Sequence, residues 1–389
     1  MAGAGSGKNR SKQGTAKERR LGVTLHPADQ EGLNLYRAAA SELTYAPPQS
    51  PEWTESFLAG EDREGVIAIF RDGGEPVSAV ALEIIRGHGV ATARFPGGSH
   101  ANGNFVPCHR ELGGNGVLLT MLEAALSEHS VRIDMLSLER QRETLCGVRN
   151  PFLTPDATAS ADVALAIDLT GGIDQVLSGS TGKRKRKKHR SQRRKLEAAG
   201  GYRRLTAKNE QQVERLLAAF FQMKAERFRN LGIRNVFEEA RVQEAFVHLF
   251  KQGLGSTPPA FQLDALEVDG RLRAVTGSSR IDSSIICEFS SFLEDELVHA
   301  SPGDFLFHEN ILTACEEGLA LYDFSVGDEF YKRQWCDVER RYRDLFIGLT
   351  GKGKALARSK QVSAGLKRRL KSSPAAMRTF KKLRSLAGN

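Results

Sequence analysis

One series of helices and strands occurs twice along this chain of 389 residues. Each occurrence predicts hairpin strands, then a helix that follows a glycine-containing turn, then further strands. The first comprises a helix over 30–43, strands over 66–70 and 77–85, a helix over 118–126, and strands over 133–138 and 163–169. The second comprises helices over 183–199, 210–229 and 239–252, strands over 261–268, 272–280 and 284–292, a helix over 303–317, and strands over 321–325 and 342–348. The repetition predicts an α/β (α+β) fold of two units in tandem, with mixed sheets flanked by helices.

Chain length agrees with two units, because 389 residues exceed what one hydrophobic core usually holds. We predict a disordered basic N-terminus over 1–20, an N-terminal domain over 21–170, a C-terminal domain over 171–350 with the basic helix 183–199 inserted, and a basic amphipathic tail over 351–389. No apolar run approaches the ~20 residues of a membrane span, and a cytoplasmic protein is expected. The five cysteines lack the spacing of metal ligands, so no metal is expected.

The net charge of +9 is concentrated in three segments. Residues 183–195 hold ten Lys and Arg residues, residues 351–389 hold twelve, and neither segment contains an acidic residue. Residues 1–20 are basic as well, so the rest of the chain is acidic on balance. This segregation predicts local contacts with polyanions. Nucleic acid is not expected as a partner, because no stacking aromatic residues interleave the basic run.

Ser301, Pro302 and Gly303 stand where the late helix begins. Free backbone N–H groups at a helix start attract phosphate, and a glycine there leaves room for the anion. We therefore predict a phosphate or pyrophosphate site at Pro302, Gly303, Asp304 and Phe305, with Ser301 capping the helix and contacting the anion. The alternative is a plain turn that only starts the helix.

A second group of residues follows the strand over 321–325. Asp323 could act as a general base or orient an amine, or it could tie down the turn at Gly327. Tyr331 offers a phenol that could protonate a thiolate. Lys332 could bind an anionic substrate or pair with Asp323. Trp335 lies four residues after Tyr331, which is the spacing of packing on one helix face.

These residues carry a resemblance to a known family. The helix start at 301–303, followed by Asp323-Phe324-Ser325-Val326-Gly327-Asp328-Glu329-Phe330-Tyr331-Lys332-Arg333-Gln334-Trp335, resembles the signature of the cellulose-biosynthesis (CelD-like) branch of the GNAT acyltransferases. That branch is similar to exopolysaccharide- and holdfast-associated N-acetyltransferases. The basic segment 185–200 resembles its basic helix, and residues 45–53 resemble its aromatic-turn-Trp element. The resemblance covers roughly residues 22–348. One departure is that relatives often carry a His shortly before the equivalent of Arg227, where this chain has Gln222-Met223-Lys224.

The resemblance implies two tandem GNAT-type domains and an N-acyltransferase that uses acetyl-CoA or another acyl-CoA. The pyrophosphate of CoA would lie at 301–305, and Asp323, Tyr331 and Lys332 would be the catalytic residues. Its acceptor would be an amino-sugar of an exopolysaccharide, or a lipid-linked saccharide precursor. Basic residues would hold the phosphate groups of the substrate: Arg186, Arg190, Arg194 and Arg227.

Other interpretations stay open for the basic segments. In the tail, Val362, Leu366 and Leu370 share one helix face and Met377, Phe380 and Leu383 share another, which is typical of helices that lie on an anionic membrane, here the inner face of the plasma membrane. A disordered tail or a contact with an anionic nucleotide are alternatives. A Fem-like aminoacyl transfer from tRNA, or a non-catalytic module that binds polyanions or membranes, are the alternative functions.

Overall fold

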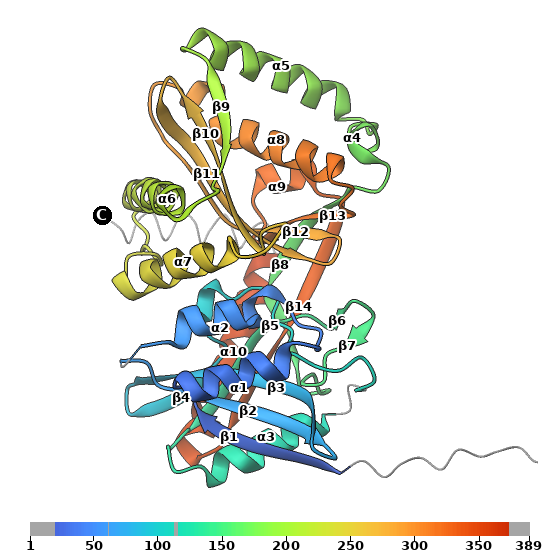
Figure 1. Cartoon of the computed structure of the whole chain (residues 1–389), viewed down its shortest axis with the longest axis vertical. Coiled ribbons are helices and arrows are strands. Elements are labelled where there is room, and N and C mark those ends of the chain that lie inside the picture. Colours follow the sequence, from blue (N-terminus) through green and yellow to red (C-terminus); the bar gives the residue numbers. More distant parts are fainter. Residues whose placement is uncertain (1–19, 61, 113–115, 373–389) are drawn as a thin grey trace, which may run out of the picture.

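The computed structural model describes residues 20–60, 62–112 and 116–372 of the chain. Its helices and strands are drawn in Figure 1. The strands are β1 (Leu21–Pro27), β2 (Gly65–Asp72), β3 (Glu75–Gly87), β4 (Val90–Arg94), β5 (Met135–Gln141), β6 (Thr144–Leu145), β7 (Val148–Arg149), β8 (Thr158–Asp168), β9 (Tyr202–Thr206), β10 (Phe261–Val268), β11 (Arg271–Ile281), β12 (Ser284–Phe292), β13 (Leu321–Val326) and β14 (Val338–Gly348). The helices are α1 (Gln30–Ala40), α2 (Pro51–Leu58), α3 (Val117–Glu128), α4 (Gly172–Val176), α5 (Gly182–Ala198), α6 (Glu210–Asn230), α7 (Ala240–Gly253), α8 (Pro302–Glu316), α9 (Phe330–Trp335) and α10 (Gly351–Ser372).

Twelve strands of the described chain form one continuous sheet in the order β1-β2-β3-β4-β5-β14-β8-β13-β12-β11-β10-β9. The two ends of this order repeat one another, because β1 to β5 and β9 to β13 follow the same path. Both paths contain a parallel pair, β4 with β5 and β12 with β13. Strands of both halves meet in the middle of the sheet. β14 pairs with β5 of the first half, and β8 pairs with β13 of the second half. The predicted tandem α/β architecture with mixed sheets is therefore confirmed, while the boundary near Gly171 stays a prediction.

Helices cover both faces of the sheet in each half. In the first half, α1 and α2 bury residues such as Tyr36 and Leu58 against one face, and α3 buries Leu118 and Leu122 against the other. In the second half, α6 and α7 cover one face, and α5 and α8 cover the other (Figure 1). Each helix thus turns one apolar stripe to the sheet, which is the arrangement expected of amphipathic helices in a layered fold.

An aromatic contact joins the two halves. Trp53 on α2 stacks on Phe57 with ring centroids 4.9 Å apart, and Phe57 meets Phe246 on α7 edge to face at 5.6 Å. The indole of Trp53 donates a hydrogen bond to the carbonyl of Pro96 over 2.9 Å, so its polar edge is satisfied inside the core. The sequence element around Trp53 therefore serves the interface between the halves.

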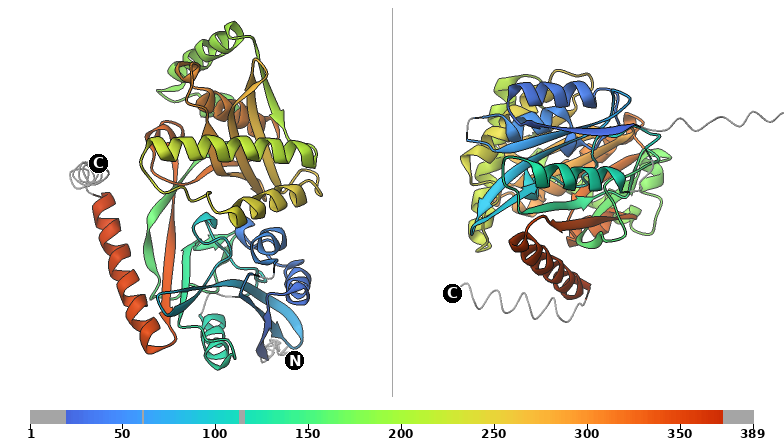
Figure 2. Two further views of the ribbon diagram at one scale, coloured as in Figure 1. Left: turned by 90° about the vertical axis from the view of Figure 1, so that its left-hand side faces the viewer. Right: turned by 90° about the horizontal axis from the view of Figure 1, so that it is seen from below.

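The long helix α10 contains the first of the two amphipathic segments expected in the tail, the one over 362–370. It runs without interruption from Gly351 to Ser372 and lies along one side of the sheet, where Ala357 packs with Met135 and Phe346 (Figure 2). The predicted segment around Met377 and the N-terminal residues 1–19 lie outside the described residues. No helix in the described part of the chain is long and apolar enough to cross a membrane.

Candidate functional site

The parallel strands β12 and β13 separate in the middle of the second half. They pair only at Ser284 with Leu321, Ile285 with Tyr322, and Ile286 with Asp323, and then diverge. Just past the last pair, β12 bulges at Glu288, which has no counterpart on β11 between the paired residues on either side of it. The bulge re-aims the side chains of β12 and places Glu288 beside the gap between the two strands.

Glu288 is a carboxylate in an unusual environment. The hydroxyl of Ser279 on β11 donates a 2.5 Å hydrogen bond to its Oε1, while its Oε2 is buried without a partner among the described residues. The pKa of Glu288 is raised to about 7, mainly by burial and also by the charge of Asp323, while the Ser279 hydrogen bond and Arg142 oppose the rise. A carboxylate with this pKa can take up a proton near neutral pH, which is what a general base must do. Sequence analysis did not single out Glu288.

Asp323, which the sequence analysis predicts to be catalytic, is fully buried, and both of its carboxylate oxygens have partners. Its Oδ1 accepts a 2.7 Å hydrogen bond from the backbone N–H of Ser325, a residue with a φ of 58°. Its Oδ2 lies 3.4 Å from Nη1 of Arg340 and 3.6 Å from Nη2 of Arg142. The carboxylate therefore holds the irregular end of β13, at Ser325 rather than at the turn of Gly327, and it also compensates two arginines.

Tyr331 and Lys332 lie on the short helix α9, next to the open end of β13. Burial raises the pKa of Tyr331 above its usual value, and a hydrogen bond with the Ser290 side chain on β12 opposes that rise. The phenol of Tyr331 therefore stays protonated, and its hydrogen bond links α9 to β12, the strand that carries Glu288. The ammonium of Lys332 donates 2.8 Å to the carbonyl of Val326 and pairs with Glu329 at 3.1 Å. The expected pair with Asp323 is thus not formed. Trp335 is buried in the core, as predicted.

The start of α8 presents backbone N–H groups that no described side chain caps. Ser301 has a φ of 53°, in the left-handed region, and its hydroxyl does not cap the helix, so the predicted N-cap bond is wrong. A Cβ on Gly303 would lie 3.1 Å from Cδ1 of Phe292 at the end of β12. The guanidinium of Arg227 stands 4.7 Å above the ring of Phe292. Gly303 and Arg227, both predicted to bind phosphate, therefore contact the same aromatic ring.

The basic helix α5 packs on α8. Lys188 pairs with Asp304 at 2.9 Å, and Gln192 donates to the same carboxylate over 3.0 Å, so the one acidic side chain in the first turn of α8 is already neutralised. The three arginines proposed to bind substrate lie on the exposed side of α5: Arg186, Arg190 and Arg194. Figure 1 places this helix at the outer end of the molecule, beyond α8. The structure thus brings Lys188, which was not proposed, to the candidate phosphate site.

A buried histidine pair lies between α5 and α8. The rings of His189 and His308 stack with centroids 3.7 Å apart and planes 12° from parallel, and His189 bonds Glu309 over 2.7 Å. These three residues are the one group of potential metal ligands found in the described part of the chain. Because the lone pairs of stacked imidazoles lie in nearly parallel planes, they do not converge on one point, and this geometry favours a packing role.

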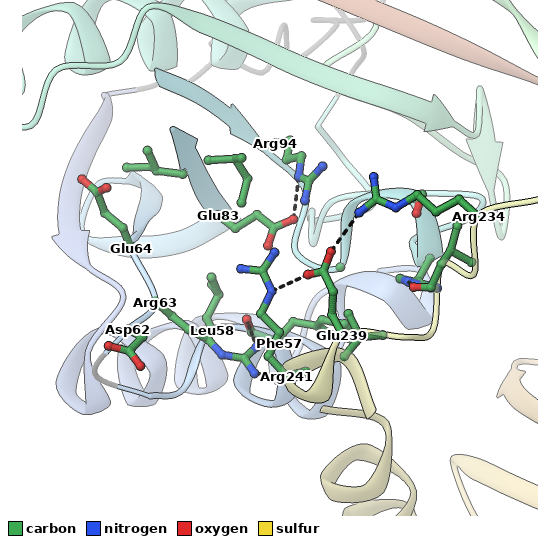
Figure 3. A pocket seen from close by; sticks show the side chains of 17 residues that line it. Phe57, Leu58, Asp62, Arg63, Glu64, Glu83, Arg94, Arg234, Glu239 and Arg241 are labelled. Atoms are coloured by element: carbon green, nitrogen blue, oxygen red, sulfur yellow. Dashed lines mark hydrogen bonds and ion pairs between the residues drawn. The ribbon is translucent and has the colours of Figure 1, made fainter. Parts of the chain in front are cut away.

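Two cavities open where the halves meet. The first, of about 390 Å³, is lined by Arg142 and Arg340, the two arginines that contact Asp323, and by Tyr342 among others. The second, of about 260 Å³, is shown in Figure 3. There Glu83 pairs with Arg94, and Glu239 pairs with both Arg234 and Arg241. Because its charges largely compensate one another, this second cavity is typical of a contact that holds the halves together.

Comparison with known proteins assigns the second half. Residues 183–333 match the family described as the acetyltransferase (GNAT) domain. The second half of the chain contains a GNAT acetyltransferase domain. The match supports the predicted enzyme class, a GNAT-type N-acyltransferase with acyl-CoA as its substrate, and it includes β12, α8, β13 and the part of α9 up to Arg333. No curated protein matches the chain.

Solved structures resemble the chain over most of its length. FemX superposes with a TM-score of 0.56 at 11% identity, over 84% of this chain and 97% of FemX. The C-terminal domain of a protein named as a lysylphosphatidylglycerol synthetase from Agrobacterium fabrum superposes with a TM-score of 0.51 at 12% identity, over 85% of this chain and 95% of that domain. A tandem GNAT protein from the clavulanic acid biosynthesis pathway is also similar, with a TM-score of 0.45 and 15% identity over 85% of this chain and 99% of that one. At such identities the likeness concerns the fold.

Proposed function

We propose that the protein transfers an acyl group from acyl-CoA to an amine at the gap between β12 and β13. The observation that carries this proposal is the position of Glu288 on the β12 bulge, just where the two strands separate. The uncapped start of α8 lies near the other end of β12, beside Phe292, and would hold the pyrophosphate of CoA together with Arg227. The CoA arm would then follow β12 from Phe292 toward Glu288.

The reaction assigns a task to each side chain near the gap. The amine nitrogen attacks the thioester carbonyl, an N–C bond forms, and the C–S bond breaks. Glu288 accepts the proton that the amine loses. Tyr331, whose raised pKa keeps the phenol protonated, donates a hydrogen bond to the departing thiolate, which takes its proton from solvent as CoA leaves. Asp323 acts by positioning Arg142 and Arg340 rather than by proton transfer, since both of its oxygens already have partners. Lys332 fixes the end of β13.

The proposal also names the acceptor that receives the acyl group. Resemblance to the CelD-like branch supports an amino-sugar of an exopolysaccharide or a lipid-linked precursor, handled at the inner face of the plasma membrane. The exposed residues Val362 and Leu366 on the basic helix α10 support contact with an anionic membrane surface there. The alternative, a Fem-like aminoacyl transfer, is favoured by the exposed arginines of α5, which could face the phosphates of tRNA.

A CoA-release assay tests the proposal. The purified protein is incubated with acetyl-CoA and a panel of amino-sugars and sugar-nucleotide amines, and free thiol is measured. Thiol release that depends on both an amine and Glu288 supports the function. Failure of acetyl-CoA to bind at millimolar concentration in a calorimetric titration would rule it out. Retention of tRNA at physiological salt, without acetyl-CoA binding, would favour the Fem-like alternative.

A further inference from the structure

Two guanidinium groups contact the one carboxylate of Asp323, and in the described part of the chain the nearby Glu288 forms an ion pair with neither of them. Arg142 and Arg340 share the single carboxylate of Asp323, at 3.6 Å and 3.4 Å, distances longer than those of a close ion pair. The Arg142 side chain is only 7% exposed, and its Nε donates to the carbonyl of Gly103 over 3.0 Å. A guanidinium this deeply buried is costly unless an anion faces it. The cluster therefore has room for one more negative group.

The 390 Å³ cavity is the place where such a group could enter. Arg142 lines it from just after the end of β5 and Arg340 from β14, and Arg341 also lines it, with 79% of its side chain exposed. Two acidic residues also line the cavity. Glu143 pairs with Arg343 over 2.6 Å, and Asp282 lies on the exposed turn between β11 and β12. Neither compensates Arg142 or Arg340 in the contacts of the described residues.

This cavity adjoins the proposed catalytic carboxylate. Asp323, which Arg142 and Arg340 contact, pairs with Ile286 on β12, two residues before Glu288. An acceptor held in the cavity would therefore extend toward Glu288.

We propose that the cavity formed by Arg142, Arg340 and Arg341 binds an oxyanion group, a phosphate or a carboxylate, carried by the amine acceptor. This inference rests on the proposed function and narrows it to acidic amines. Guanidinium groups bind both oxyanions through paired hydrogen bonds, which explains why arginines and no lysines line the cavity. The oxyanion would replace the missing negative charge beside Asp323 and would orient the amine toward Glu288.

Calorimetric titration of the full-length protein saturated with CoA tests this, because the CoA phosphates already occupy the α8 site. The probes are glucosamine, glucosamine 6-phosphate and muramic acid, which share the amine and differ in having no acid, a phosphate or a carboxylate. We expect one of the two acidic probes to bind with a Kd at least about tenfold lower than glucosamine. Arg340→Met should abolish this difference, and Arg341→Met should reduce it.

Arg271→Met is the matched control, because it removes one exposed arginine from the far end of β11. It should leave the preference for the acidic probe unchanged. Equal or undetectable binding of all three probes, or a preference that survives in Arg340→Met, would overturn the inference. These outcomes can be told apart from failure of the proposed function, which would show as absent binding in the calorimetric titration with acetyl-CoA.

Discussion

The hydroxyl of Ser279 on β11 donates a 2.5 Å hydrogen bond to Oε1 of Glu288 at the bulge of the neighbouring strand β12. Because this bond favours the ionised carboxylate, it opposes the rise in pKa that burial causes. The two opposing effects thus keep the pKa of Glu288 near neutral pH, where a general base is most effective.

Replacing Glu288 by Gln removes the proposed base without changing the size of the side chain. We expect kcat with acetyl-CoA and a good acceptor to fall by about 100-fold or more, the usual contribution of a general base. The KM for acetyl-CoA should change little, since the carboxylate is not at the α8 site. Steady-state thiol release checks this, and retention of near-normal kcat would remove Glu288 from the mechanism.

Ser279→Ala should shift the pH dependence of the same reaction. A base is active when ionised, so kcat/KM of the native protein should rise with pH through about 7, the pKa of Glu288. Loss of the Ser279 hydrogen bond raises that pKa, and the midpoint of the rise should therefore move to higher pH. The rate at pH 9 should be nearly unchanged. A downward shift, or no shift, would contradict the assignment. Ser290→Ala is a useful comparison, because Ser290 contacts Tyr331 instead.

A bulky residue at Gly303 should block the α8 site. The Cβ position already lies 3.1 Å from Phe292, so Gly303→Trp must displace the ring or cover the free N–H groups. The native protein should gain about 2.7 kcal/mol of stability at an acetyl-CoA concentration of 100 Kd, and the variant should gain none. Thermal denaturation with and without ligand measures this. Gly179→Trp, at a site with no atom within 4 Å of the Cβ position, is the control and should respond like the native protein.

Asp323→Asn should destabilise the fold. The change leaves Arg142 and Arg340 without their shared carboxylate, and loss of one partner from a buried pair typically costs about 3–5 kcal/mol. Asp282→Asn, on an exposed turn of the same cavity, should change the free energy of unfolding by about 0.5 kcal/mol or less. Urea denaturation separates the two. Full stability of Asp323→Asn, combined with lost activity, would restore a direct catalytic role for Asp323.

His308 should make the protein sensitive to acid. Its pKa is lowered from 6.5 to about 4, mainly by burial and also by the charge of His189. Between these values the unfolded state binds a proton that the folded state excludes, so stability falls as the pH decreases from about 6.5 toward 4. The loss attributable to His308 is about 3 kcal/mol at most. Denaturant titrations of native protein and His308→Gln across this range should show a shallower dependence in the variant.

Much of the fold could be predicted, because long periodic segments identify themselves. In the second half β10 and β12 have the predicted bounds, β11 and β13 agree to within a residue, and β14 begins four residues earlier than predicted. Short or edge strands were missed, namely β1, β4 and β9, since five to seven residues with few apolar side chains carry little periodic signal.

The site was predicted less completely than the fold. Gly303, Asp323 and Tyr331 were found from local motifs, and all three lie around the gap between β12 and β13 or at the start of α8. Glu288 was missed because a bulge is not visible in a sequence, although an acidic residue inside Ile285-Ile286-Cys287-Glu288-Phe289 was a usable signal. Arg142 could not be found, because only the folding of the first half against the second brings it to Asp323.

The position of β14 between β5 and β8 has a practical consequence for anyone who dissects the molecule. A polypeptide ending near Gly171 would carry β5 and β8 without the strand that joins them, and the complementary piece would expose β13 and β14 along bare edges. Unpaired strand edges tend to pair with strands of other chains. Fragments made separately should therefore precipitate or reassociate, and neither should work as an autonomous enzyme.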